Sequence, residues 1–591
     1  MSSRLSYGAL LALISLLAVP PVAAERAEDL LPTSADGRFG GTLVVPQRAE
    51  PRTLNPVTAL DAPSREVIRR MTADLVSINR QSQQAEPGIA KSWTVSRDGR
   101  EFVLELRRGL RFSDGHPCDA DDVLFTFNVY LDETVHSPQR DLLIIGGRPL
   151  TVEKVDAHRV RFRLAEPYAA AERIFDSLAI LPRHLLEPAW KEGKLSAAWG
   201  LNVQPAAIAG LGPFRLQDYR PGERIVLERN PYYWKTDRQG KRLPYLDRLE
   251  FRFVAVEDAQ TLGFLSGEAD LLNRVGFRNF EMLRNDERTK EDQLIDAGAG
   301  LEYNFLFFNL GPVDAKKYPR IADRQGWFRS VPFRQAVSAA LDRDAIIRLV
   351  YGGHAAPLWG HVTPGNRLWQ NTKLPHPARS VDRARQLLRG AGFHWQPDGS
   401  LLDSSGKHVE FSIVASSSSP ERLQMAALIQ ADLKELGIQV QVVSLEFRAL
   451  VDRILNSRDY EASILGLGGG DADPNAEVNV WLSSGVSHLW SPGQAQPMTP
   501  WEAELDRLIR QQMITLNPSE RKALYDRVQE IAAENLPLIP LAAPHVLVAA
   551  RRSLGNFRPS ILDHNTLWNV EQLYWRNAPG VSTARKETWF R

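Results

Sequence analysis

Apolar and polar residues alternate with a period of two in several short stretches, and this pattern predicts β-strands. In the clearest case, Phe214 and Leu216 alternate with polar neighbours before Pro221-Gly222, and the alternation resumes at Ile225. Pro and Gly suit the two central positions of a type II turn, so this stretch is predicted to form a β-hairpin. Alternating or buried-looking apolar runs predict further strands over residues 40–46, 102–106, 160–164, 249–254, 303–309 and 438–443.

Other stretches place apolar residues three and four positions apart, which predicts amphipathic helices. Phe333, Val337 and Leu341 have this spacing, and so do the residues that follow Pro420. Asp119, with Asp122 three residues later, is expected to cap a helix at its N-terminus. Helices are also predicted after Asp342 and over residues 379–392, 501–514 and 518–535. The helix from Pro420 ends at Gly437 before a strand, so the chain has the order expected of an α/β protein.

The first 24 residues have the pattern of a signal peptide. Arg4 precedes a short apolar run over residues 8–19, and Val22-Ala-Ala24 places small residues where signal peptidase cuts. The apolar run is shorter than the ~20 residues that a membrane span requires, and no later stretch is long and apolar enough. We expect cleavage after Ala24 and export to the periplasm. No cysteine lies at the cleavage point, so a bacterial lipoprotein is not expected.

The composition is that of a large globular protein. The chain has 591 residues, of which 43% are hydrophobic and 24% charged, so it can bury more than one core. The 72 basic and 71 acidic residues leave no net field that would favour a nucleic acid. Cys118 is the only cysteine, so no internal disulfide can form, and no pattern of a cysteine hydrolase surrounds it.

The sequence does not indicate an enzyme. Its 12 histidines are scattered without a metalloprotease helix, and serines 416–419 lack the setting of a nucleophile elbow. A secreted hydrolase would need a nucleophile and a base that are not evident. The alternating Arg159, Arg161 and Arg163 are interpreted as the solvated side of a half-buried strand rather than an anion site. No catalytic residue, metal or cofactor is predicted.

The glycine-rich stretch from Gly466 to Glu477 is the main candidate for binding chemistry. It does not fit a dinucleotide loop, because Asp471 stands where the third glycine is needed, and no Gly-Lys-Ser/Thr follows as in a phosphate loop. Asp471, Asp473 and Asn475 copy the opening of a calcium loop. However, Ala476 and Leu482 replace the required glycine and the bidentate glutamate of such a loop.

Several motifs together resemble the peptide-binding proteins of ABC importers, the family 5 extracellular solute-binding proteins. The matches are spread over most of residues 39–557, and they include Pro51–Pro56, Arg107–Val123, Gly210–Trp234 and Gly267–Asp270. The resemblance implies a two-lobed α/β periplasmic binding protein fold of the large, three-subdomain type. A ligand cleft is expected between the lobes.

The same resemblance implies a division of the chain. Lobe I is expected over residues 25–303, with an inserted subdomain at roughly 75–205, and lobe II over 304–544. Residues 545–591 are expected to return to lobe I and end in a tail. A monomer is expected to capture di- to oligopeptides by lobe closure and to deliver them to permease subunits in the inner membrane.

Site residues follow from the resemblance one by one. Asp471 matches the aspartate that pairs with a peptide's α-ammonium. Asp473 is the alternative if the gap in the match to the family falls at a different position. A loop carboxylate at a turn, with no binding role, is the structural alternative. Gly470 belongs to the same loop. The positions of Phe447 and Phe125 match aromatic contacts or are plain core. The backbone near Asp61 and Ala62 matches the loop that pairs with extended peptide.

One departure leaves the ligand open. Leu465 stands where oligopeptide binders have an arginine, so no group is assigned to a ligand carboxylate, and peptide length is not predicted. The fold also serves binders of nickel chelates and oligosaccharides, and a non-peptide solute is therefore the alternative.

Overall fold

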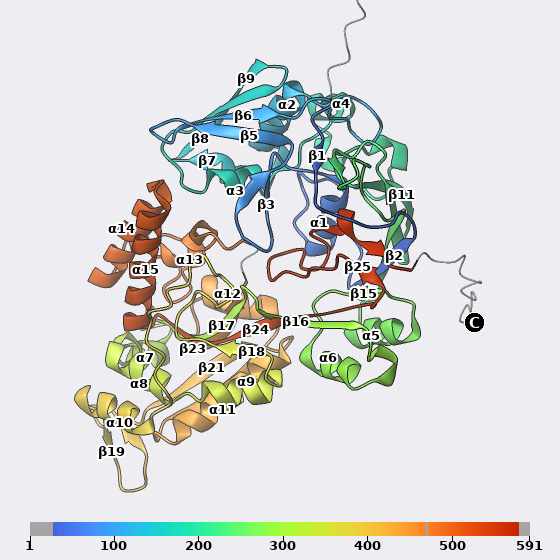
Figure 1. The fold of residues 1–591 in the computed structure, drawn as a ribbon. Coiled ribbons are helices and arrows are strands. Elements are labelled where there is room, and N and C mark those ends of the chain that lie inside the picture. Colours follow the sequence, from blue (N-terminus) through green and yellow to red (C-terminus); the bar gives the residue numbers. More distant parts are fainter. Residues whose placement is uncertain (1–27, 469–470, 578–591) are drawn as a thin grey trace, which may run out of the picture.

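Two large clusters of buried apolar side chains organise this chain, as described by a computed structural model over residues 28–468 and 471–577. The first cluster draws on residues 35–271 and 546–573. The second draws on residues 299–543. Figure 1 shows the corresponding two bodies, one above with the blue and cyan strands of the first half of the chain, and one below with the yellow and orange helices. We refer to them as the upper body and the lower body.

The predicted hairpin is confirmed, and it lies in a four-stranded sheet of the upper body. Gly222 has φ +70°, a conformation that glycine adopts without the steric cost a side chain would bring and that a type II turn requires. The two hairpin strands pair antiparallel with each other, while β2 joins parallel to β14. In spatial order the strands are β11 (Phe214–Arg220), β12 (Arg224–Arg229), β14 (Arg248–Phe253) and β2 (Thr42–Gln47).

A second four-stranded sheet forms the top of the upper body (Figure 1). Its order is β5 (Ala90–Val95), β6 (Glu101–Leu106), β10 (Arg159–Arg163) and β9 (Thr151–Asp156), all antiparallel. The arginines of β10 lie on its solvated side, where Arg161 and Arg163 form ion pairs with Glu101 and Glu153. The surface interpretation of these arginines is therefore confirmed.

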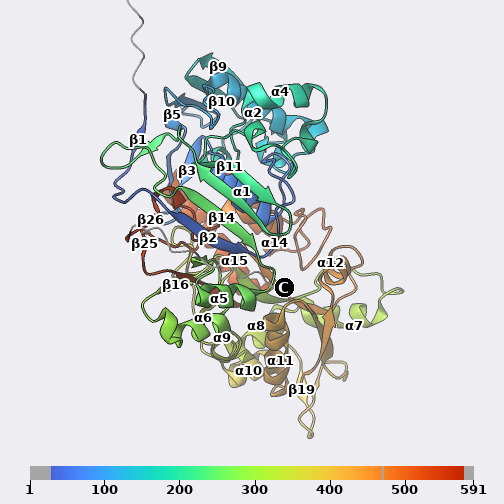
Figure 2. The same ribbon diagram turned by 90° about the vertical axis from the view of Figure 1, so that its right-hand side faces the viewer.

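Helices complete the upper body. Asp119 caps α2 in a capping box with Asp122, as the sequence predicted. Its helices are α1 (Ala62–Met71), α2 (Ala120–Leu131), α3 (Ala171–Phe175) and α4 (Arg183–Lys191). Two further helices, α5 (Glu257–Ser266) and α6 (Phe277–Arg284), pack in a separate small cluster between the two bodies. In Figure 2, α1 lies beside the sheet of β11, β14 and β2, while α5 and α6 lie below that sheet, next to the lower body.

The lower body is built on one mixed sheet of eight strands that extends into the upper body. Its path is β15 (Leu271–Leu272), β24 (Leu538–Ala550), β17 (Tyr303–Phe308), β23 (Ala462–Leu467), β21 (Glu410–Ser416) and β22 (Gln439–Leu445). Two further strands pair with β24, namely β16 (Gln293–Ala299) and β18 (Ala355–Pro357).

The predicted helices of the lower body are confirmed. Gly437 follows the end of α11 and has φ +77°, a left-handed conformation. A Cβ at this position would lie 2.1 Å from the Gly399 carbonyl oxygen, so only glycine fits. The helices are α7 (Pro319–Arg329), α8 (Val331–Ala340), α9 (Arg343–Tyr351), α10 (Val381–Gly390), α11 (Pro420–Lys434), α12 (Phe447–Leu455), α13 (Val478–Trp481), α14 (Pro500–Ile514) and α15 (Pro518–Asn535).

The long strand β24 joins the two bodies. Its first half pairs with β17 and β18, and its second half pairs with β16 and β15. Residues Leu547 and Ala549 pack with α5 and α6 in a small third cluster. Because β16 also runs directly into β17, two segments cross between the bodies at this point. We call it the strand crossing.

Candidate functional site

Asp471 lies where the lower body meets the upper body. It belongs to the loop that follows β23. Gly470, which was also predicted as a site residue, lies outside the described residues. The Asp471 carboxylate Oδ1 lies 2.6 Å from a guanidinium nitrogen of Arg173, which belongs to α3 of the upper body. Arg173 also donates to the Gln83 carbonyl at 2.8 Å. A loop carboxylate of one body thus holds a cation of the other.

Asp473 has a different environment from Asp471. It accepts two hydrogen bonds from Arg521 of α15, at 2.8 and 2.6 Å, and its side chain is only 5% exposed. It also accepts from the Asn475 backbone N–H at 3.0 Å, which caps the short turn that follows. The Asp471 side chain is 34% exposed. Of the two carboxylates, Asp471 is therefore the accessible one.

Burial raises the pKa of Asp471, and the nearby Arg173 opposes this shift. The carboxylates of Asp473 and Asp176 add to the upward shift because like charges disfavour ionisation. A positive group brought next to Asp471 would therefore relieve unfavourable electrostatics. The arrangement suits cation binding.

Further contacts join the two bodies beside this loop. The Gln83 side chain, from the turn between β3 (Val76–Ile78) and β4 (Ala85–Pro87), donates to the Gly365 carbonyl at 2.9 Å. The backbone N–H of Ala169 donates to Met513 of α14 at 2.8 Å. The bodies therefore touch through polar contacts on the side of Asp471.

A cavity of about 630 Å³ lies at the strand crossing, bounded by both bodies. Ala62, at the first turn of α1, lines it from the upper body, and Asn304 and Arg422 line it from the lower body. Asp61 does not line the cavity but caps α1 by accepting from the Ser64 N–H at 2.9 Å. Cavities of this size are typical of small-ligand sites.

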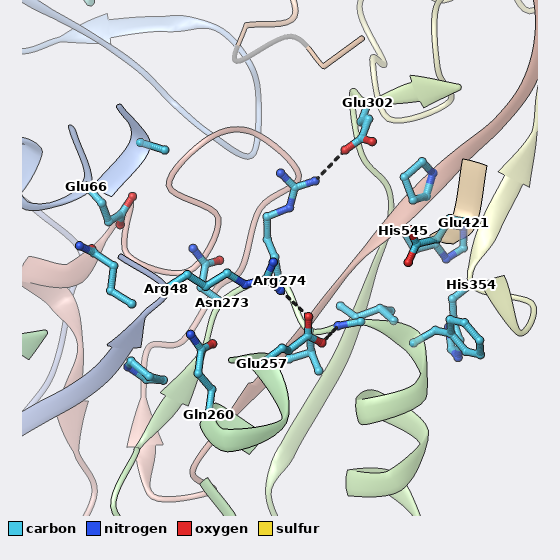
Figure 3. Close-up of a pocket in the computed structure, with 18 of the residues that line it drawn as sticks. Arg48, Glu66, Glu257, Gln260, Asn273, Arg274, Glu302, His354, Glu421 and His545 are labelled. Atoms are coloured by element: carbon cyan, nitrogen blue, oxygen red, sulfur yellow. Dashed lines mark hydrogen bonds and ion pairs between the residues drawn. The ribbon is translucent and has the colours of Figure 1, made fainter. Parts of the chain in front are cut away.

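The charged side chains of the cavity carry both signs (Figure 3). Arg48 pairs with Glu257, and Arg274 pairs with Glu302 at 3.3 Å. Arg422 reaches the same Glu302 at 3.3 Å. The wall therefore offers carboxylates and guanidinium groups close together, as a zwitterionic or polar solute requires. Asp471 is not part of this lining; it lies against a smaller cavity of about 30 Å³.

Comparison with known proteins identifies the family. Residues 84–488 match the model described as bacterial extracellular solute-binding proteins, family 5 Middle. The chain belongs to this family. The resemblance inferred from the sequence motifs is therefore confirmed.

Family 5 relatives cover nearly the whole chain. A probable ABC transporter-binding protein of Deinococcus radiodurans is 28% identical over 91% of this chain and 93% of its own length. Di/tripeptide-binding protein 1 of Pseudomonas aeruginosa is 25% identical over 90% of this chain and 94% of its own. The structure of the oligopeptide-binding protein AppA of Bacillus subtilis, in complex with a nonapeptide, has a TM-score of 0.67 at 22% identity. It covers 92% of this chain and 100% of that one, which confirms the two-lobed α/β fold.

The predicted aromatic contacts of this family 5 protein lie apart from both cavities. Phe125 is buried in the upper body, with its ring 5.6 Å from that of Trp190. Phe447 begins α12 and is 47% exposed. Leu465 is buried on β23. The structure does not bring these side chains together with Asp471, so their role in binding stays a prediction.

Two other candidates have structural explanations. Cys118 is buried, and burial raises its pKa well above the usual range, which does not suit a reactive thiolate. In the acidic loop, Asn475 accepts from Gln512 at 2.7 Å, and Asp473 is held by Arg521. Side chains of the protein therefore already occupy the oxygens that a calcium ion would need.

Proposed function

We propose that this family 5 protein captures a peptide between its two bodies and delivers it to the permease of an ABC importer. The observation that carries the proposal is the ion pair between Asp471 and Arg173, because it places a loop carboxylate against a cation at the boundary of the bodies. A peptide's α-ammonium would take the place of the guanidinium. The printed names of relatives, including a di/tripeptide-binding protein, support this choice of ligand.

We propose that the two lobes close around the bound peptide. A ligand that touches both lobes favours the closed state, and one that touches a single lobe does not. We propose the lobe boundaries near residues 303 and 544, with the inserted subdomain at roughly 75–205. The change of buried cluster between Leu271 and Ala299, and again between Ala543 and Val546, supports these boundaries. We also propose that the protein acts as a monomer and is not an enzyme.

Short peptides should stabilise the purified protein against heat. Binding to the folded state alone adds ~2.7 kcal/mol at a hundredfold excess over Kd, so a peptide library should contain members that raise Tm clearly. Mass spectrometry of solute released from protein purified under native conditions would identify the class directly. A shift with an oligosaccharide or a metal chelate, and none with any peptide, would contradict peptide capture and support the alternative solute.

The mature protein should begin at Glu25 in the periplasm. None of the described helices is both long and apolar enough to cross a membrane. We propose that export depends on the leader, in which Val22-Ala-Ala24 supplies the cleavage site. N-terminal sequencing of periplasmic protein tests the cleavage, and Ala24→Lys is expected to block it. Recovery of an intact Met1 form retained in the membrane would show that the segment is not removed.

A further inference from the structure

We propose that Asp296, His354 and His545 form a binding site for a divalent transition-metal ion, zinc in particular, at the strand crossing. One possible ligand atom from each residue lies within 4.8 Å of those of the other two. The residues come from β16, from the turn after α9 and from β24. Two imidazoles and a carboxylate are a donor set that zinc and related ions accept.

The two imidazoles converge on one carboxyl group. Nδ1 of His354 lies 2.8 Å from Asp296 Oδ2, and Nδ1 of His545 lies 2.9 Å from the same oxygen. Around a tetrahedral zinc ion with bonds of about 2.0 Å, neighbouring donor atoms are about 3.3 Å apart. The two nitrogen–oxygen distances would therefore need to lengthen by only a few tenths of an ångström, roughly 0.4–0.5 Å, to admit the ion.

Glu281 supplies the outer contact that metal-bound histidines commonly have. Its carboxylate lies 2.9 Å from Nε2 of His354, the ring nitrogen that faces away from Asp296. With the carboxylate of Glu281 on Nε2–H, Nδ1 is the nitrogen that can bind a metal, in place of its hydrogen-bond contact with Asp296. Arg284 pairs with Glu281 at 2.8 Å, and the Phe280 ring packs edge-on against His354. The imidazole is thus held in one orientation.

The site opens toward the large cavity. His354 and His545 both line the cavity, and Figure 3 shows them with Glu421 at the end opposite Glu66. Their side chains are only 12% and 21% exposed, and that of Asp296 is 31% exposed. Three protein ligands leave at least one coordination position for water or for an atom of a bound solute. The ion would also link α9 of the lower body to both crossing strands.

Zinc titration of untagged, chelator-treated protein tests the site. Calorimetry and elemental analysis should find one Zn²⁺ per chain. His545→Ala and Asp296→Asn should each weaken binding by more than about 100-fold, because each removes a ligand. Glu281→Leu should weaken binding by about 10–100-fold, the range usual for an outer partner. His408→Ala, at an exposed histidine remote from the cluster in sequence, is the matched control and should change nothing.

Either of two results would overturn the proposal. One is the absence of zinc uptake by the wild-type protein at micromolar metal, which would leave a purely hydrogen-bonded cluster. The other is equal affinity in the wild type and in both ligand variants, with circular dichroism showing that at least one of these variants is folded. No peptide enters the titration, so the outcome is independent of the proposed peptide capture.

Discussion

Asp473→Ala should lower the free energy of unfolding by about 3–5 kcal/mol. The substitution removes the partner of Arg521, whose side chain is 6% exposed and therefore has little access to water. Arg521 keeps its hydrogen bonds to Gln512 and its position 4.7 Å from the Trp369 ring, but neither neighbour carries a negative charge. An unpaired charge would then remain buried. Urea unfolding followed by circular dichroism measures the loss.

A second substitution, at an exposed ion pair, shows whether the loss of stability comes from the buried position of the pair or from the loss of any ion pair. Glu504→Gln removes the partner of Arg507 on α14, where the two side chains are 41% and 58% exposed. Water can solvate Arg507 there, so little measurable loss is expected. If Asp473→Ala and Glu504→Gln destabilise the protein equally, the pair between Asp473 and Arg521 does not have the proposed structural role.

The local structure was largely predictable because local chemistry determines it. The Pro-Gly turn of the hairpin, the capping box at Asp119 and the glycine after α11 each depend on a few neighbouring residues, and the structure confirms all three. Strands and helices followed from periodicity for the same reason. The family motifs then supplied the fold, which periodicity alone does not specify.

The candidate site was less predictable because it joins distant segments. Asp471 and Arg173 are 298 positions apart, and nothing in the sequence around either residue indicates the other. No local sequence pattern connects His354 with His545. The two histidines meet Asp296 only because the strands cross between the bodies at this point. The order of the residues and the Asp-Pro that follows favour Asp471 over Asp473 in the sequence, and the structure adds that the Asp471 side chain is the more exposed of the two.

Asp471→Asn should weaken peptide binding by about 2–5 kcal/mol, which is roughly 1.5 to 3.5 decades in Kd. The α-ammonium loses its water on entering the boundary between the bodies, and the carboxylate must replace that solvation. Asparagine keeps the shape and removes the charge. The fold should survive, because the side chain is 34% exposed and its partner Arg173 also donates to Gln83.

N-acetylation of the peptide shows whether the lost interaction is the one proposed. Acetylation should weaken binding to the wild type about as much as the substitution does. It should add little to Asp471→Asn, since both changes remove the same contact. Arg173→Met is the matched control, because it breaks the same ion pair between the bodies but leaves the carboxylate in place. This variant should still prefer the free peptide over the acetylated one. If calorimetry finds that the wild type binds both peptides equally, or that Arg173→Met abolishes the preference as Asp471→Asn does, Asp471 is not the ammonium anchor.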